Sequence, residues 1–258
     1  MPVTLKAESK DPAIRAQREA AARRVLDYFG DGLPGSRLLC FLDDNDPVIL
    51  KHAFGAANRG AYGPIKDSTS LDIWPDYVTG CILVDDGISL LFPRVIDDLV
   101  YLYGSTCANE VGLTITLAHE LQHSIQHAYA RRVWAVNSLI PQLPKTAIAA
   151  LKLQWADIPI ERETRIVSKG VAVDFFGEQR VTEYIDEKIA QGITRGDVAD
   201  VADFQFIRTL TPSSSVDLTD DTQQLFNRLK SHRSELEAVL QEKKDDPDFS
   251  DIDLDAYF

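Results

Sequence analysis

The sequence of 258 residues predicts an α+β fold, in which a small N-terminal sheet precedes a mostly helical C-terminal half. Three observations support this prediction. The apolar run SRLLCFLDD at 36–44 is typical of a buried strand. Two apolar runs within 79–92 flank Asp86-Gly87, a dipeptide that favours a tight hairpin turn. Beyond about residue 107, apolar residues recur at helical spacing.

The first predicted element is a helix from Pro12 to about Phe29. Asp11 is suited to its N-terminus because a carboxylate can accept a hydrogen bond from an unpaired backbone N–H. Proline favours the first helical position, and Gly30 favours the end of the helix. Much of 56–79 shows neither a helical nor a strand pattern, so we expect it to be irregular.

After the hairpin, the sequence predicts a helix from Pro93 to about Tyr103 and a long helix over about 107–135. One side of the long helix is expected to be buried, because leucine and isoleucine repeat every four residues along it. The residues of this stripe are Leu113, Leu117, Leu121 and Ile125. Further helices are predicted over about 144–155, 159–176, 178–191 and 219–243.

The chain is expected to form one domain over 1–243, followed by an acidic tail over 244–258. The tail is rich in aspartate and contains Pro247, so we expect it to lack a fixed fold of its own. Its aromatic residues could still dock in a groove or recruit a regulatory partner.

Composition narrows the classes of partner. The net charge of −13 argues against nucleic acid as a ligand, since a polyanion would be repelled. No apolar run reaches the roughly 18–20 residues that span a bilayer, and the N-terminus shows no secretory signal. The three cysteines form no CxxC pair and no disulfide framework. We therefore expect a cytoplasmic protein that binds neither nucleic acid nor membrane.

The segment LAHELQHSIQHAYA, residues 117–130, contains three of the five histidines. On a helix, His119 and His123 project from the same face about 6 Å apart, so both can donate a ring nitrogen to one metal ion. Glu120 is rotated about 100° from His119, where it could act as a base on a water bound to that ion. These are the features of an HExxH zinc site. The alternative is an ordinary helix whose solvent-exposed face is polar and binds no metal.

A catalytic zinc site needs a third protein ligand. His127 lies about 12 Å along the helix axis from His119, too far to share one ion. The metzincin pattern is excluded, because Gln126 and Tyr129 stand where it requires glycine and histidine. The best remaining candidates are Glu161 and, after it, Glu163, in the first turns of the helix predicted at 159–176, with another residue as the third alternative. Both glutamates could instead simply favour a helix N-terminus.

The segments ILVDDGISLLF, LAHELQHSIQ and IPIERETRIV, within about 80–180, resemble the gluzincin clan of zinc metallopeptidases, especially its small prokaryotic members. The resemblance implies a zincin-like fold whose hairpin packs on the active-site helix, with Glu161 as third ligand. It also implies that a strand of the hairpin aligns an extended peptide substrate. Thr164 and Arg165 stand where the family has alanine and an acidic residue or asparagine, so Asp174 could replace that acidic support.

The predicted function is zinc-dependent hydrolysis of peptide bonds, with Glu120 activating a zinc-bound water. Its partner would be a protein or peptide substrate. A donor to the oxyanion is also required, and the sequence does not choose among His127, Tyr129, Arg165, Tyr184 and His232. One alternative is a catalytically inactive zincin-fold protein that binds a regulatory partner. The other is a helical interaction protein without metal.

Overall fold

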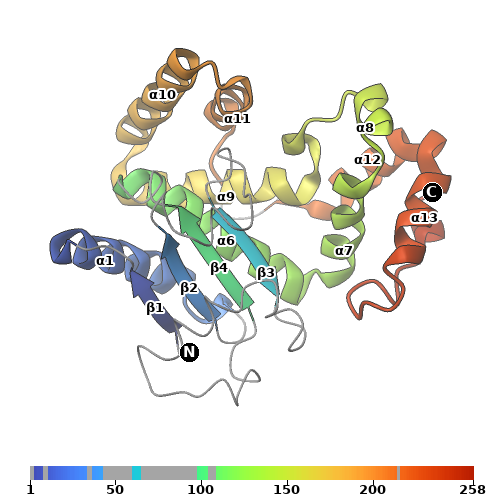
Figure 1. Ribbon diagram of the computed structural model, residues 1–258, viewed down its shortest axis with the longest axis horizontal. Helices are drawn as coiled ribbons and strands as arrows, with labels where there is room; N and C mark the ends of the chain where they lie inside the picture. The colour runs from blue at the N-terminus through green and yellow to red at the C-terminus, as the bar shows by residue number, and fades with distance from the viewer. Residues whose placement is uncertain are drawn as a thin grey trace.

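The structure of the chain is a computed structural model that describes residues 3–7, 11–33, 37–42, 60–64, 98–103, 109–213 and 216–258, with side chains over 11–14, 16–33, 109–213 and 216–258. Helices dominate these residues (Figure 1). Two long helices, α6 (Glu110–Tyr129) and α9 (Pro159–Phe176), pack against each other along the middle of the molecule. The other elements are arranged around this pair.

The N-terminal part begins with β1 (Val3–Ala7), α1 (Pro12–Phe29) and β2 (Arg37–Leu42). The two strands are parallel, which requires the crossover that α1 provides. The predicted bounds of α1 are confirmed. Asp11 accepts a hydrogen bond from the backbone of the first turn, and Gly30 ends the helix at φ 50°, a conformation that glycine adopts readily.

Two more strands, β3 (Gly60–Pro64) and β4 (Asp98–Tyr103), complete a sheet in the order β1-β2-β4-β3. β4 is parallel to β2 and antiparallel to β3. The predicted helix over 93–103 is therefore wrong for 98–103. Its residues, DLVYLY, include valine, tyrosine and leucine, and the aromatic and β-branched ones favour a strand that has partners on both sides.

The predicted α+β class, with an N-terminal sheet built on a hairpin, is also wrong. Over 11–33, 109–213 and 216–258, where side chains are described, every regular element is a helix. The four strands are described by their backbone alone, and none of their pairs is a tight hairpin. β2 pairs with β1 and with β4 in parallel, and the antiparallel neighbours β3 and β4 are separated by residues 65–97. The predicted hairpin at 79–92 lies outside the described residues.

The long helix predicted over 107–135 is two helices. Asn109 caps α6 by accepting hydrogen bonds from the backbone N–H groups of Val111 and Gly112. α6 ends at Tyr129, Ala130 lies between the two helices, and α7 (Arg131–Leu139) runs in a new direction (Figure 1). Neither glycine nor proline occurs at the break. The turn instead lets the apolar residues of α7 enter a separate hydrophobic cluster in the C-terminal part.

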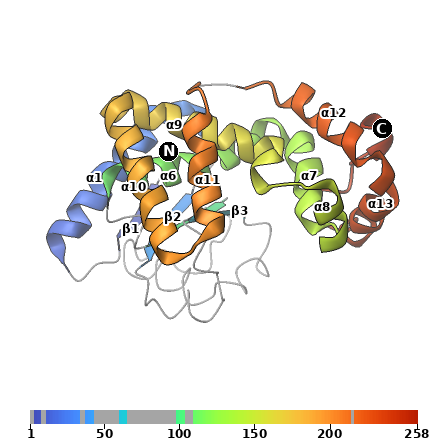
Figure 2. The ribbon, with the colours of Figure 1, turned by 90° about the horizontal axis from the view of Figure 1, so that it is seen from above.

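The remaining helical elements follow in chain order, with a helical hairpin formed by α10 and α11 next to α9 (Figure 2). α9 has the predicted bounds, α11 was not predicted, and the single helix expected over 219–243 is divided in two. The bounds are η1 Gly30–Gly32, η3 Ile140–Gln142, α8 Lys145–Leu151, η4 Trp155–Asp157, α10 Glu178–Arg195, α11 Val198–Thr209, α12 Leu218–Arg228, η5 Leu229–His232, α13 Arg233–Glu242 and η6 Leu254–Ala256.

The predicted apolar stripe of α6 is confirmed. Leu113, Leu117 and Leu121 are buried between α1 and α9, and Ile125 packs at the edge of the same cluster. On the sheet side, β3 and β4 lie against α6. Because α6 is held from several directions, the polar residues of its other face are fixed relative to α9.

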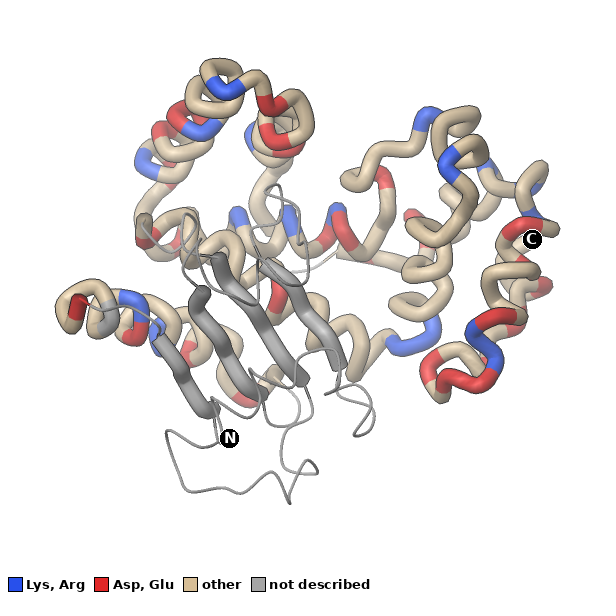
Figure 3. Tube along the Cα trace, viewed as in Figure 1, with Lys and Arg blue, Asp and Glu red and all other residues tan. Residues whose placement is uncertain are grey.

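The C-terminal segment 244–258 differs from the predicted tail without a fixed fold. Phe249 and Leu254 are each only 5% exposed, and they belong to the cluster formed by α7, α8, α12 and α13. The rings of Tyr257 and Phe258 pack at tilted angles against Phe226 of α12. Figure 3 shows the acidic residues of this segment near the basic start of α7, where Arg131 and Arg132 form ion pairs with it. Burial of a few apolar side chains therefore orders an otherwise acidic segment.

Candidate metal centre

The histidine pair comes from the middle of α6. His119 and His123 are one turn apart on one face, and their ring centroids are 4.9 Å apart. His123 is buried, whereas the side chain of His119 is 18% exposed. This pairing follows from local helix geometry alone, so it could be predicted without knowledge of the fold.

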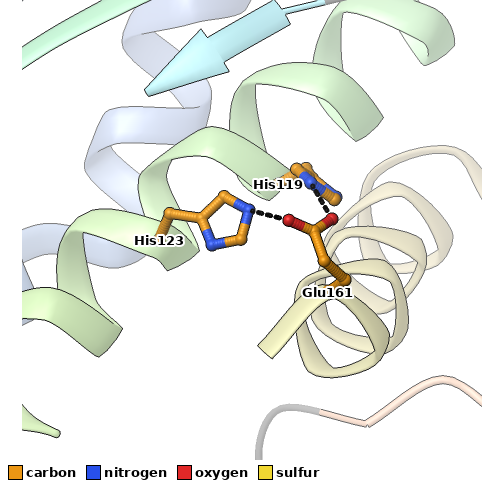
Figure 4. Close-up of side chains that lie close together, drawn as sticks. All are labelled: His119, His123 and Glu161. Atoms are coloured by element: carbon orange, nitrogen blue, oxygen red, sulfur yellow. Dashed lines mark ion pairs between the residues drawn. The ribbon is translucent and has the colours of Figure 1, made fainter. Parts of the chain in front are cut away.

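The third member comes from the first turn of α9, which begins at Pro159. The two carboxylate oxygens of Glu161 point at the histidine pair (Figure 4). Oε1 lies 3.3 Å from Nε2 of His123, and Oε2 lies 3.5 Å from Nε2 of His119. The ligand atoms of the three residues all lie within 4.8 Å of one another. His119, His123 and Glu161 thus form a group that could hold a metal ion.

Glu161 is the member of the group, whereas Glu163 has other partners. The carboxylate of Glu163 accepts hydrogen bonds from the side-chain amides of Gln122 and Gln126. Burial raises the pKa of Glu163 above its ordinary value, although the two amides oppose this effect. Of the two glutamates considered from the sequence, only Glu161 therefore faces the histidines.

Burial and mutual charge set the protonation states of the group. Burial lowers the pKa of His119 to about 3, because an imidazolium loses its hydration there. Burial has the same tendency at His123, but the negative charges of Glu161 and Glu120 and a hydrogen bond with Gln126 outweigh it and raise the pKa of His123. Burial would raise the pKa of Glu161, yet His123 and His119 hold it well below the ordinary value.

Arg165 holds the carboxylate of Glu161 from the other side. Its Nη1 donates to Oε2 of Glu161 at 2.9 Å and to the Glu161 carbonyl oxygen at 2.7 Å. Its Nε donates to Asp203 of α11 at 2.8 Å. The guanidinium is buried and committed to these two acidic partners. Arg165 thus orients Glu161 and neutralises part of its charge.

Glu120, the residue expected to act as a base, is buried beside the histidine pair at 7% exposure. Its charge reaches His123, since it contributes to raising the pKa of that histidine. The role of Glu120 as a general base stays a prediction.

Other residues considered from the sequence lie elsewhere. Asp174 is thirteen residues beyond Glu161 on α9, roughly 20 Å along the axis, and accepts a hydrogen bond from Tyr28. It is too far away to support a ligand of this group. Tyr184 is buried against Phe204. His232 pairs with Glu235 near the start of α13.

His127 and Tyr129 occupy the C-terminal end of α6. The Nε2 atom of His127 lies 3.1 Å from Oδ1 of Asp248, and its ring packs edge-on against Trp134. Asp248 also pairs with Arg131. Tyr129 is 67% exposed. His127 therefore links α6 to the C-terminal segment. No local sequence pattern predicts this contact, because its two residues are far apart in the sequence.

Sequence reasoning missed the support of His123. Gln126 is three residues after His123 on α6, and its Oε1 lies 2.8 Å from Nδ1 of the histidine. Its amide nitrogen bonds the Ile160 carbonyl oxygen and Glu163 of α9. A glutamine three residues after the second histidine was the signal, because residues at that spacing share a helix face.

No protein-family model, no curated protein and no solved structure matches the chain. In the described part of the chain, no helix is both long and apolar enough to cross a membrane.

Proposed function

We propose that this protein is a zinc-dependent metallopeptidase with a gluzincin-type set of ligands, two histidines on one helix and a glutamate on the next. The observation that carries the proposal is the convergence of His119, His123 and Glu161, with Glu120 adjoining the first histidine. Residues 38 positions apart in the sequence, His123 and Glu161, meet here with their ligand atoms directed at one another.

The donor set fits zinc. Two neutral imidazole nitrogens and one carboxylate oxygen are the protein ligands of a common catalytic zinc arrangement, which leaves a fourth position for water or substrate. The low pKa values of His119 and Glu161 keep both groups unprotonated at neutral pH. The group is close-set and largely buried, so little reorganisation would be needed to hold an ion.

When bound, zinc would polarise the scissile carbonyl and lower the pKa of water in the site. Glu120 would accept the proton of the attacking water and pass it to the leaving amine, so that no charged amide nitrogen has to depart. Arg165 would keep Glu161 oriented through its bond to Oε2. It is occupied by Glu161 and Asp203, which argues against the role of oxyanion donor considered from the sequence.

The first test is metal binding by the chain of 258 residues. Protein freed of metal and titrated with Zn²⁺ should bind about one ion per chain, and the double variant His119→Ala/His123→Ala should lose it, because several simultaneous bonds must repay the dehydration of the metal. Stoichiometric zinc binding in the double variant would refute the site. The variant His232→Ala serves as a control, since that histidine lies outside the group.

The second test is hydrolysis. Wild type and Glu120→Gln, at matched zinc occupancy, would be screened against unfolded proteins and peptide libraries. The glutamine side chain is nearly isosteric with glutamate but cannot accept the proton of the attacking water. General-base catalysis is typically worth about 10²–10⁴ in rate, so the variant should lose most of its activity. Zinc binding without any cleavage by wild type would favour the alternative of an inactive partner-binding protein. Equal cleavage by both would show that Glu120 is not the base.

A further inference from the structure

The side chain of Gln126 stands between a histidine of the candidate metal centre and α9. Its Nε2 lies 2.9 Å from the carbonyl oxygen of Ile160 and 2.6 Å from Oε2 of Glu163. Its Oε1 lies 2.8 Å from Nδ1 of His123. Both Gln126 and Glu163 are buried, at 2% and 6% exposure, so water has little access to these bonds.

The orientation of the Gln126 amide follows from its partners. A backbone carbonyl such as that of Ile160 can only accept a hydrogen bond, so the amide group that faces it must be the NH₂. The second amide hydrogen serves Glu163. The reversed orientation would bring two carbonyl oxygens together in a buried site, which costs the desolvation of both.

This orientation dictates the state of His123. The amide oxygen of Gln126 has no hydrogen, so the ring nitrogen that it faces, Nδ1, must carry one. A neutral imidazole has a single N–H, so Nε2 is then the ring nitrogen whose lone pair can bind an ion. Nε2 is the atom that faces Glu161, at 3.3 Å.

We propose that Gln126, anchored by Ile160 and Glu163, is a positioning residue that locks His123 in the Nδ1–H tautomer and aims its Nε2 atom at the metal position. Ile160, Glu161 and Glu163 all come from the first turn and a half of α9. The same short stretch therefore supplies the carboxylate ligand and, through Gln126, the orientation of one histidine ligand. The effect on metal binding rests on the proposed function, whereas the tautomer of His123 does not.

Gln122 provides a matched control. It is one turn before Gln126 on α6 and is also buried, and its Nε2 donates to the other oxygen of Glu163 at 3.3 Å. The structure gives it no hydrogen bond to either histidine of the group among the described contacts. Gln122→Met and Gln126→Met remove the same chemical group from the same helix at neighbouring turns, but only the second removes the partner of His123.

The test uses the chain of 258 residues, first without metal and then with Zn²⁺ alone. Nitrogen-15 NMR, recorded at increasing pH until the His123 ring has become neutral, reports which of its ring nitrogens carries the remaining proton. Wild type and Gln122→Met should show Nδ1–H, and Gln126→Met should show Nε2–H or a mixture. Zn²⁺ titration should give a Kd raised about 10- to 100-fold in Gln126→Met, the usual cost of losing a support of a ligand, and a nearly unchanged Kd in Gln122→Met.

An Nε2–H tautomer in wild type would overturn the proposal without any variant, so the test survives if Gln126→Met fails to fold. An unchanged tautomer in folded Gln126→Met, or an equal loss of affinity in both variants, would also overturn it. If wild type shows Nδ1–H, Gln126→Met loses it and no form binds Zn²⁺, the positioning of His123 stands and the proposed metallopeptidase function fails.

Discussion

The C-terminal segment offers a sharp prediction about stability, because its order depends on few side chains. Phe249 is 5% exposed and packs in the hydrophobic cluster of α7, α8, α12 and α13. Replacing a buried phenylalanine by alanine typically costs about 3–5 kcal/mol, from lost apolar burial and from the cavity left behind. A segment near the chain end can collapse into part of that cavity, so we expect Phe249→Ala to cost about 3 kcal/mol.

For a chain of this size, each kcal/mol lowers the Tm by roughly 2–4 °C, so the variant should melt about 6–12 °C below wild type. Circular dichroism melting and urea titration would both be recorded in the presence of chelator, because bound metal would add its own stabilisation. The urea midpoint should fall with little change of slope. Ser250→Ala is the matched control. The side chain of Ser250 is next to Phe249 in the sequence but is exposed, so this substitution should change the free energy of unfolding by no more than about 0.5 kcal/mol.

A Phe249→Ala variant that melts within a degree of its Ser250→Ala control would refute the packing of this segment. The acidic composition of 244–258 would then decide its behaviour, as the sequence alone suggested. A loss near the expected size would instead make the segment part of the folded domain.

Two further predictions concern the metal centre. Glu161→Ala should weaken Zn²⁺ binding more than Glu163→Ala, because only Glu161 faces both histidines. The two affinities would be measured by competition with a chelator. A larger loss in Glu163→Ala would mean that the third ligand is wrongly assigned. Zn²⁺ affinity should fall about tenfold per pH unit as pH decreases below the raised pKa of His123, since one proton then competes with the metal. The pKa of His119 is about 3 and that of Glu161 is low, so a hundredfold slope near pH 6 would show that a second ligand also takes up a proton.

Residues that favour helix ends predicted the bounds of several helices, including the start of α9, which holds Glu161. Asp11-Pro12 and Gly30 mark the ends of α1, and Pro159 marks the start of α9, because capping and proline geometry act within one turn. Where a break has no such signal, as at Ala130, the prediction of a single helix was wrong. The direction of α7 is set by the hydrophobic cluster it joins, which is assembled from distant segments.

The sequence by itself determined that His119, Glu120 and His123 lie together on a helix, because i, i+4 spacing is a property of one helix and needs no partner. It also determined the apolar stripe that buries the opposite face of α6. Only the tertiary structure decided that Glu161 meets the histidines, that Gln126 supports His123, that 98–103 is a strand and that Phe249 is buried. Each of these depends on residues brought together from distant positions, and local periodicity contains no information about which of them will meet.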